Sequence, residues 1–108
     1  EIIVSIEIPA CTASAFRKVG KRNALAVSCL NMAVARRAGE ISVAGGAAAP
    51  KPLYCAETSR LLSAGDERTA FAALQREISP IDDRWATASY RRTVSERLLR
   101  ALAEETEA

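Results

Sequence analysis

The sequence predicts an α+β fold: an antiparallel sheet of three to four strands with about three helices packed on one face, a two-layer sandwich. Three observations lead to this prediction. Apolar runs of strand length occupy the first half of the chain, apolar residues at helical spacing occupy the second half, and the two types do not alternate. The lack of βαβ alternation argues against a Rossmann-type nucleotide domain. We expect residues 1–108 to form a single domain.

The strands are expected first. Residues 1–9 alternate between apolar and polar side chains, which is typical of a half-buried strand, and Pro9 ends it. We expect a small-residue loop over residues 10–15 and a basic turn or irregular crossing over residues 16–23.

A hairpin is expected next. Residues 24–37 are almost continuously apolar, and periodicity alone does not separate a buried strand from a helix there. Gly39 leads by a short turn into a second apolar run over residues 41–44, so we interpret both runs as strands. Gly45-Gly46 and the Pro50-Lys51-Pro52 segment are expected to break the strand pattern and to rule out a regular central strand there.

Helices follow the proline-rich segment. The first is expected over residues 55–64 and stops at Gly65. Asp66 is a suitable N-cap for the second, and Pro80 closes it. The apolar face expected for this second helix consists of Ala70, Phe71, Leu74 and Ile78.

The last helix is expected from about Thr87 to Glu105. Glu96 and Arg100 are expected to form an i,i+4 pair on its solvent-exposed face. Its buried stripe is expected to consist of Tyr90, Val94, Leu98, Ala101 and Leu102.

Composition excludes several classes of function. Hydrophobic residues make up 49% and charged residues 26% of the 108 residues, an ordinary globular composition. The net charge of +2 is too small to favour a nucleic-acid partner, and no apolar run is long enough to span a membrane. The chain begins without methionine inside an expected strand, so we expect a fragment of a longer polypeptide.

The cysteine and histidine content excludes several kinds of catalytic and metal-binding site. The three cysteines, Cys11, Cys29 and Cys55, are odd in number and widely spaced. This pattern indicates reduced thiols in a cytoplasmic protein, not a disulfide framework or a zinc site. Histidine is absent, which removes the usual general base and the usual zinc ligand. We therefore expect no catalytic residue and no metal ligand in this chain.

Several motifs have a structural and a functional interpretation. Gly45-Gly46 lacks the rest of a phosphate-binding pattern, so a bulge or a close backbone approach is favoured. Asp82-Asp83 is interpreted as a helix cap, not an acid–base pair. Tyr90-Arg91-Arg92 is interpreted as a buried tyrosine with solvated or paired arginines. Trp85 is an exposed interface anchor or a lid on the core.

The basic segment near the start is the best candidate binding site. Phe16, Lys18 and Arg22 lie close together in the sequence, and a lysine there is placed to receive a flavin carbonyl or a phosphate. From chemistry alone, a solvated basic loop is the alternative.

Five short motifs together resemble one family. The strand ending Ile8-Pro9 precedes a Lys-x-x-x-Arg segment at Lys18 and Arg22. The remaining motifs are Val43 to Ala47 with Pro50 to Pro52, Glu57 with Leu61-Leu62, and Asp83-Arg84 with Tyr90-Arg91-Arg92. In this order, they resemble the C-terminal domain of the FAD-binding (medium) subunit of molybdenum hydroxylases, the family of xanthine dehydrogenase and carbon monoxide dehydrogenase.

The resemblance implies a role in a multi-subunit oxidoreductase. The domain would pack against upstream FAD-binding domains, which hold most of the FAD, and Lys18 would reach the flavin. Molybdopterin would lie in a large partner subunit and iron–sulfur clusters in a small one. Electrons would pass from the clusters through FAD to NAD or another acceptor, and this domain alone would not be catalytic. The alternative is a freestanding α+β interaction domain without a cofactor.

Overall fold

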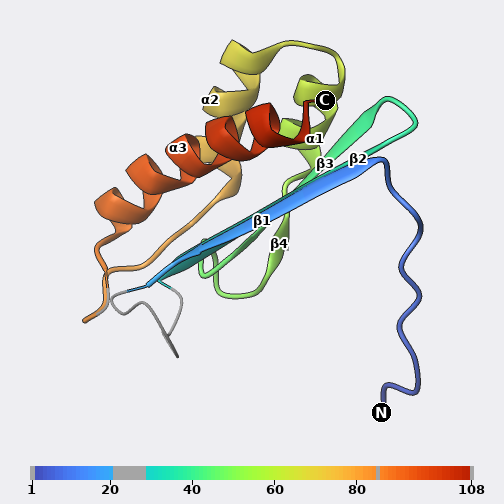
Figure 1. Cartoon of the computed structure of the whole chain (residues 1–108). Coiled ribbons are helices and arrows are strands. Elements are labelled where there is room, and N and C mark those ends of the chain that lie inside the picture. The colour runs from blue at the N-terminus through green and yellow to red at the C-terminus, as the bar shows by residue number, and fades with distance from the viewer. Residues whose placement is uncertain (1, 21–28, 85, 108) are drawn as a thin grey trace.

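The computed structural model describes residues 2–20, 29–84 and 86–107. These residues form a four-stranded antiparallel sheet in the order β1-β2-β3-β4, and three helices cover one of its faces (Figure 1). In chain order, the elements are β1 (Ala13–Val19), β2 (Leu30–Arg37), β3 (Glu40–Gly46), β4 (Leu53–Tyr54), α1 (Ala56–Ser63), α2 (Glu67–Glu77) and α3 (Ala88–Thr106). The predicted α+β sandwich is confirmed.

The β2–β3 hairpin is also confirmed. The two strands pair as far as Arg37 opposite Glu40, and the turn residues Ala38 and Gly39 have φ angles of 50° and 84°. Positive φ at both central positions is typical of the type I′ turn, whose twist suits a two-residue hairpin. Residues 24–28 of the apolar run lie outside the described residues.

The first strand lies later in the chain than predicted. Residues 2–12 form no regular secondary structure, and five apolar side chains between Ile2 and Ile8 are 78–92% exposed. A strand needs a partner for its backbone groups, and within the described residues no strand pairs with residues 2–11; Thr12, just before β1, hydrogen-bonds to the Arg36 carbonyl. β1 instead occupies Ala13–Val19, where we expected a loop and a turn, because β2 pairs with it along its whole length.

The expectation that Gly45-Gly46 interrupts the strand is wrong. β3 continues through Gly46, because Gly45 and Gly46 lie opposite Met32 and Asn31 of β2. Backbone pairing does not depend on the side chains, so pairing of both glycines with β2, and of Gly45 also with β4, outweighs the low strand propensity of glycine.

The predicted end of α1 and the predicted N-cap and end of α2 are confirmed. Gly65 has a φ of 84° just beyond the end of α1, and the Asp66 carboxylate accepts a hydrogen bond from the Thr69 N–H at 3.3 Å as the N-cap of α2. α2 ends at Glu77, before Pro80.

The buried stripe of α3 differs from the predicted one. Tyr90 and Ala101 are exposed, whereas Leu102 is buried as expected. Val94 and Leu98 pack at the border of the core. The residues of α3 that are buried are Arg91, Ser95, Leu99, Leu102, Ala103 and Thr106. The helix is therefore rotated by about one residue, which places Arg91 inside the protein and Tyr90 outside it.

The core lies between the sheet and the helices. α3 packs on β1 and β2, and α1 packs on β3 and against α2. Leu30, Met32 and Val34 of β2 point into this core, and Leu74 and Leu99 meet them from α2 and α3. Because the helices cover only one face, the other face of the sheet stays open (Figure 1).

Candidate functional site

The open face of the sheet carries Lys18 in an ordered row of side chains. Directly opposite residues in antiparallel strands point to the same face. Lys18 lies opposite Asn31, and Asn31 lies opposite Gly46. Because the neighbouring residues Leu30 and Met32 are buried under the helices, this row faces away from them. Lys18 is thus exposed on a strand and not in the turn that we expected.

The next row along the face has an aromatic residue at each end. Phe16 lies opposite Ala33, Ala33 opposite Ala44, and Ala44 opposite Tyr54. Phe16 and Tyr54 are 55% and 58% exposed. Two aromatic rings therefore flank a floor of small residues, which leaves room for a flat group on the sheet.

A trough of about 330 Å³ lies over this floor. Ala33 and Ala44 form its base, Asn31 lies at one end, and the Pro52 to Tyr54 segment forms a side. At the Asn31 end, a Cβ atom on Gly46 would lie 2.5 Å from the Asn31 Oδ1 atom, so a larger residue there would force the Asn31 side chain to move. The close contact at Gly46 is with the Asn31 side chain and not with another backbone segment, and β3 pairs in regular register through both glycines, so the prediction of a bulge or a close backbone approach is not confirmed.

Sequence reasoning identified Phe16 and Lys18 but missed Asn31 and Tyr54. Arg22, the third predicted member, lies outside the described residues. The signal that would have found the row is the alternation in Ala13–Val19, where Ser14, Phe16 and Lys18 share one face. Alanine and serine obscure this signal because neither favours strands.

The acidic pair in the last loop has structural roles. Asp82 Oδ1 accepts a hydrogen bond from the Ala88 N–H at 2.6 Å. Asp83 Oδ1 accepts one from the Ala86 N–H at 3.1 Å, and the Asp83 carboxylate forms an ion pair with Arg91 at 3.1 Å. The capping interpretation is thus confirmed for Asp82, whereas Asp83 supports the loop and pairs with Arg91, and the N-cap residue of α3 is Thr87. Trp85 lies outside the described residues, so its two interpretations stay open.

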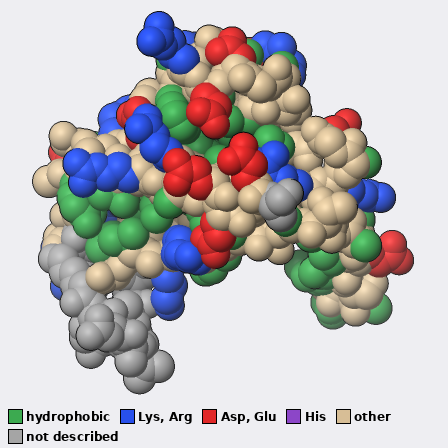
Figure 2. Space-filling model, turned by 45° about the horizontal axis from the view of Figure 1, so that its top comes forward, with side chains coloured by type: hydrophobic (Ala, Val, Ile, Leu, Met, Phe, Trp, Pro, Cys, Tyr) green, Lys and Arg blue, Asp and Glu red, His purple; other side chains and the backbone are tan. Residues whose placement is uncertain are grey.

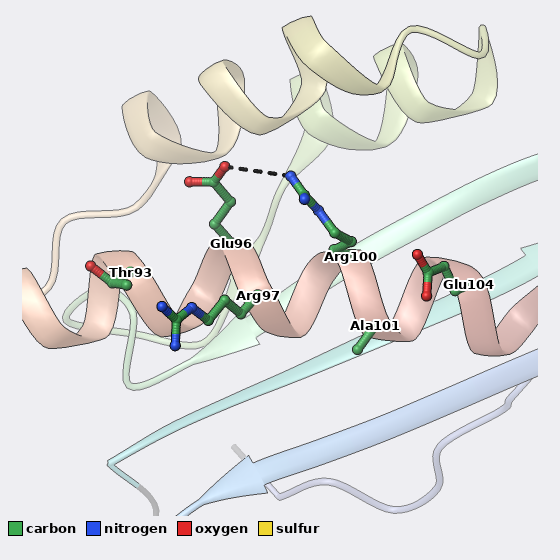
Figure 3. Close-up of a pocket in the computed structure, with 6 residues that line it drawn as sticks. All are labelled: Thr93, Glu96, Arg97, Arg100, Ala101 and Glu104. Atoms are coloured by element: carbon green, nitrogen blue, oxygen red, sulfur yellow. Dashed lines mark ion pairs between the residues drawn. The ribbon is translucent and has the colours of Figure 1, made fainter.

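The outer side of α3 is also hollowed, but its charges pair locally. Glu96 and Arg100 form the predicted ion pair at 4.0 Å, and the Arg100 guanidinium lies 4.9 Å from the centre of the Phe71 ring. The labelled side chains of this hollow all come from the one helix (Figure 3). Figure 2 shows acidic and basic side chains interspersed over this side, so no region of one sign marks a binding site.

The described residues hold no cluster of potential metal ligands. Across residues 2–20, 29–84 and 86–107, no group of three or more His, Cys, Asp or Glu side chains converges on one point. In the same ranges no helix has the length and apolar character that a membrane span requires. Cys11, Cys29 and Cys55 are thiols, not members of a disulfide.

Solved structures with the same fold include three carbon monoxide dehydrogenases. The cyanide-inactivated Cu,Mo-CO dehydrogenase is 21% identical with a TM-score of 0.76, and the match covers 92% of this chain and 38% of that one. The reconstituted enzyme from Oligotropha carboxidovorans is 20% identical with a TM-score of 0.74, over 87% of this chain and 36% of that one. The Hydrogenophaga pseudoflava enzyme that lacks the Mo-pyranopterin moiety of its cofactor is 16% identical with a TM-score of 0.75, and the match covers 92% of this chain and 38% of that one.

These likenesses define the class of protein by its fold. The chain has the α+β fold of one domain in these larger chains, and it spans little more than a third of each of them, 36–38%. The model of the CO dehydrogenase flavoprotein C-terminal domain matches residues 14–106, and the chain belongs to this family. No curated protein matches the sequence.

Proposed function

We propose that this domain forms one wall of an FAD site in the flavoprotein subunit of a molybdenum hydroxylase of the xanthine or CO dehydrogenase type. The observation that carries the proposal is the family match over residues 14–106. In such an enzyme, the flavin passes electrons from iron–sulfur clusters to NAD or another acceptor. The substrate would be oxidised at a molybdopterin centre in a large partner subunit, and the clusters would lie in a small one.

The open sheet face fits a flat ring with polar edges. Ala33 and Ala44 present only methyl groups, so a ring can lie close to the backbone. Phe16 and Tyr54 offer apolar ring surfaces at either side. Lys18 and Asn31 supply a positive charge and an amide along one edge, which suit carbonyl oxygens.

The trough is too shallow to hold FAD by itself. Ligand sites bury most of the surface of a bound molecule, whereas this face is open across its width and its aromatic residues are more than half exposed. The domain therefore supplies one side of the site, and the FAD-binding domains of the same subunit supply the rest.

Lys18 would act on the electronic state of the ring. An ammonium group at the ring edge stabilises negative charge that develops when the flavin is reduced. The side chain needs no general base or nucleophile beside it for this role, which agrees with the absence of histidine from the chain.

Flavin retention tests the proposed function. The full-length protein that carries this sequence and the 108-residue chain are each mixed with FAD, desalted and compared by visible absorption. We expect the full-length protein to retain flavin and the short chain to lose it. If neither form holds flavin, the cofactor-free interaction domain becomes the better hypothesis.

Replacement of Lys18 tests its part in the site. In the full-length protein, we expect Lys18→Ala to lower the two-electron flavin potential by about 30 mV, which corresponds to about 1.4 kcal/mol. Lys18→Arg should retain most of the potential because it keeps the charge. Arg97→Ala, which removes an exposed cation from the far side of the molecule, is the control. Identical potentials in the wild type and Lys18→Ala would contradict the assignment.

A further inference from the structure

Arg91 is a buried cation whose hydrogen-bond donors are fully used. Its side chain is 3% exposed. Nε donates to the Cys29 carbonyl at 2.7 Å, and Nη1 donates to the Ile81 and Ala86 carbonyls at 2.5 and 3.2 Å. Nη2 donates to both carboxylate oxygens of Asp83 at 3.1 Å. One guanidinium thus joins α3, the 78–87 loop and the residue that precedes β2.

The Cys29 contact lies at the Lys18 end of the sheet. The Cys29 N–H donates to the Val19 carbonyl at 2.6 Å, and Val19 follows Lys18 at the end of β1. On β2, Asn31 lies opposite Lys18, two residues beyond Cys29. A hydrogen-bonded path of two steps therefore runs from Arg91 through Cys29 to the backbone that carries Lys18.

The chemistry of arginine matches this position. A guanidinium presents its donors in a rigid planar fork, so one side chain spans several acceptors at fixed angles. A lysine ammonium is a compact point charge on a flexible stem and cannot reach Cys29, Ile81 and Asp83 together. The network therefore fixes the relative position of the three segments.

We propose that Arg91 is a positioning residue for the Lys18 site, because it holds the end of β1 and the start of β2 in register with α3. This inference rests on the proposed function for the meaning of the site. Arg91 faces the core side of the sheet, so it acts on the open face only through the Cys29 and Val19 backbone.

The test compares Arg91→Lys with Arg92→Lys in the full-length protein. Arg92 is the matched control because it is the next residue on the same helix and also anchors a carbonyl, that of Gln75 at 2.7 Å, but between α2 and α3. The readouts are amide hydrogen exchange at Cys29 and Asn31, the visible circular dichroism of bound flavin, and the dissociation constant for FAD.

In Arg91→Lys, we expect the Cys29 amide to exchange faster by roughly one to two orders of magnitude. The flavin dichroism should change shape, and the FAD dissociation constant should rise roughly tenfold. Arg92→Lys should leave all three unchanged. Unchanged Cys29 exchange in folded Arg91→Lys, or an equal flavin change in both variants, would overturn the proposal.

A second variant covers the case in which Arg91→Lys does not fold. Asp83→Asn keeps Arg91 but removes its counter-charge, so we expect smaller changes in the same direction. If Asp83→Asn changes none of the three readouts, the proposal is overturned. If wild-type protein binds no flavin, the proposed function fails. The exchange at Cys29 still decides whether Arg91 holds the strand ends.

Discussion

Glu77 acts on α1 although it belongs to α2. Its carboxylate accepts hydrogen bonds from the Glu57 and Thr58 N–H groups at 3.2 and 2.7 Å, and from the Thr58 hydroxyl at 2.6 Å. The N-cap residue of α1, Cys55, makes no side-chain cap. A carboxylate from the neighbouring helix therefore satisfies the first N–H groups and complements the helix dipole.

The same carboxylate lies near a buried thiol. Burial, with a smaller contribution from the Glu77 charge, raises the pKa of Cys55 from 9.0 to about 11. The thiol is fully buried, so it stays protonated and unreactive near neutral pH. This makes Cys55 a core residue and not a candidate nucleophile.

The raised pKa of Cys55 predicts that the protein loses stability at high pH. Between pH 9 and 11, the unfolded chain releases the thiol proton and the native protein keeps it. The native state then binds more protons, so the free energy of unfolding falls as the pH rises through this window. Below this pH window, the thiol is protonated in both states and does not make the free energy of unfolding depend on pH.

Urea unfolding of wild type and Cys55→Ala across this range measures the effect. All other ionisable side chains are common to both proteins, so the difference between the two slopes isolates the thiol. We expect a steeper decline for the wild type, and equal slopes would show that the pKa of Cys55 is not raised by folding.

At the scale of elements, serines on α1 complete the edge of the sheet. β4 pairs only with the Ala44–Gly45 part of β3. Further along, the Ser59 hydroxyl accepts from the Val43 N–H at 2.9 Å and donates to the Cys55 carbonyl at 2.6 Å. Ser63 accepts from the Ile41 N–H at 2.9 Å. These two serines, one helical turn apart, take the place of a strand partner.

Removal of the Ser59 hydroxyl is predicted to destabilise the domain. Ser59→Ala leaves the buried Val43 N–H without its acceptor, which costs about 1–3 kcal/mol. Thermal or urea unfolding measures this loss. Ser89→Ala, at an exposed position of α3, should change stability by less than about 0.5 kcal/mol. Equal stability of the two variants would mean that the hydroxyl does not support the β3 edge.

The rotation of α3 shows what apolar spacing in the sequence does not predict. Apolar spacing through Tyr90, Val94 and Leu98 describes a plausible buried face, but Arg91 occupies the buried position instead. Its burial depends on three carbonyl groups and a carboxylate that the fold gathers around it. Three of these acceptors lie within ten residues of Arg91, but the Cys29 carbonyl lies 62 residues away, so no local pattern contains the full set.

At the scale of the whole molecule, the segment before β1 contributes no packing. The backbone of this segment extends away from the sandwich (Figure 1), and the side chains of Ile2, Ile6 and Ile8 are 78–89% exposed. By contrast, Leu102 is fully buried between α3 and the sheet. The two sets of residues are equally apolar but differ completely in their contribution to the core.

This contrast predicts different effects of substitution. Joint replacement of Ile2, Ile6 and Ile8 by serine should change the free energy of unfolding of the 108-residue chain by less than about 0.5 kcal/mol. Leu102→Ala should cost about 2–5 kcal/mol. Urea unfolding with both variants measures the difference. A large loss in the isoleucine variant would show that the segment packs on the domain.

The sequence by itself determined the layers of this protein: the β2–β3 hairpin, the three helices and their caps at Gly65 and Asp66, and the order of strands before helices. These features depend on local periodicity and on residues with restricted backbone geometry, which are readable without any partner.

Tertiary structure decided the rest. Whether residues 2–8 or Ala13–Val19 form the first strand depended on which segment β2 pairs with. The open sheet face that carries Phe16, Lys18, Asn31 and Tyr54 exists only because the pairing register brings four strands together. Burial of Arg91 likewise required the Cys29 carbonyl from a distant segment beside the acceptors of the preceding loop, because a charged group enters a core only where the fold satisfies its hydrogen bonds.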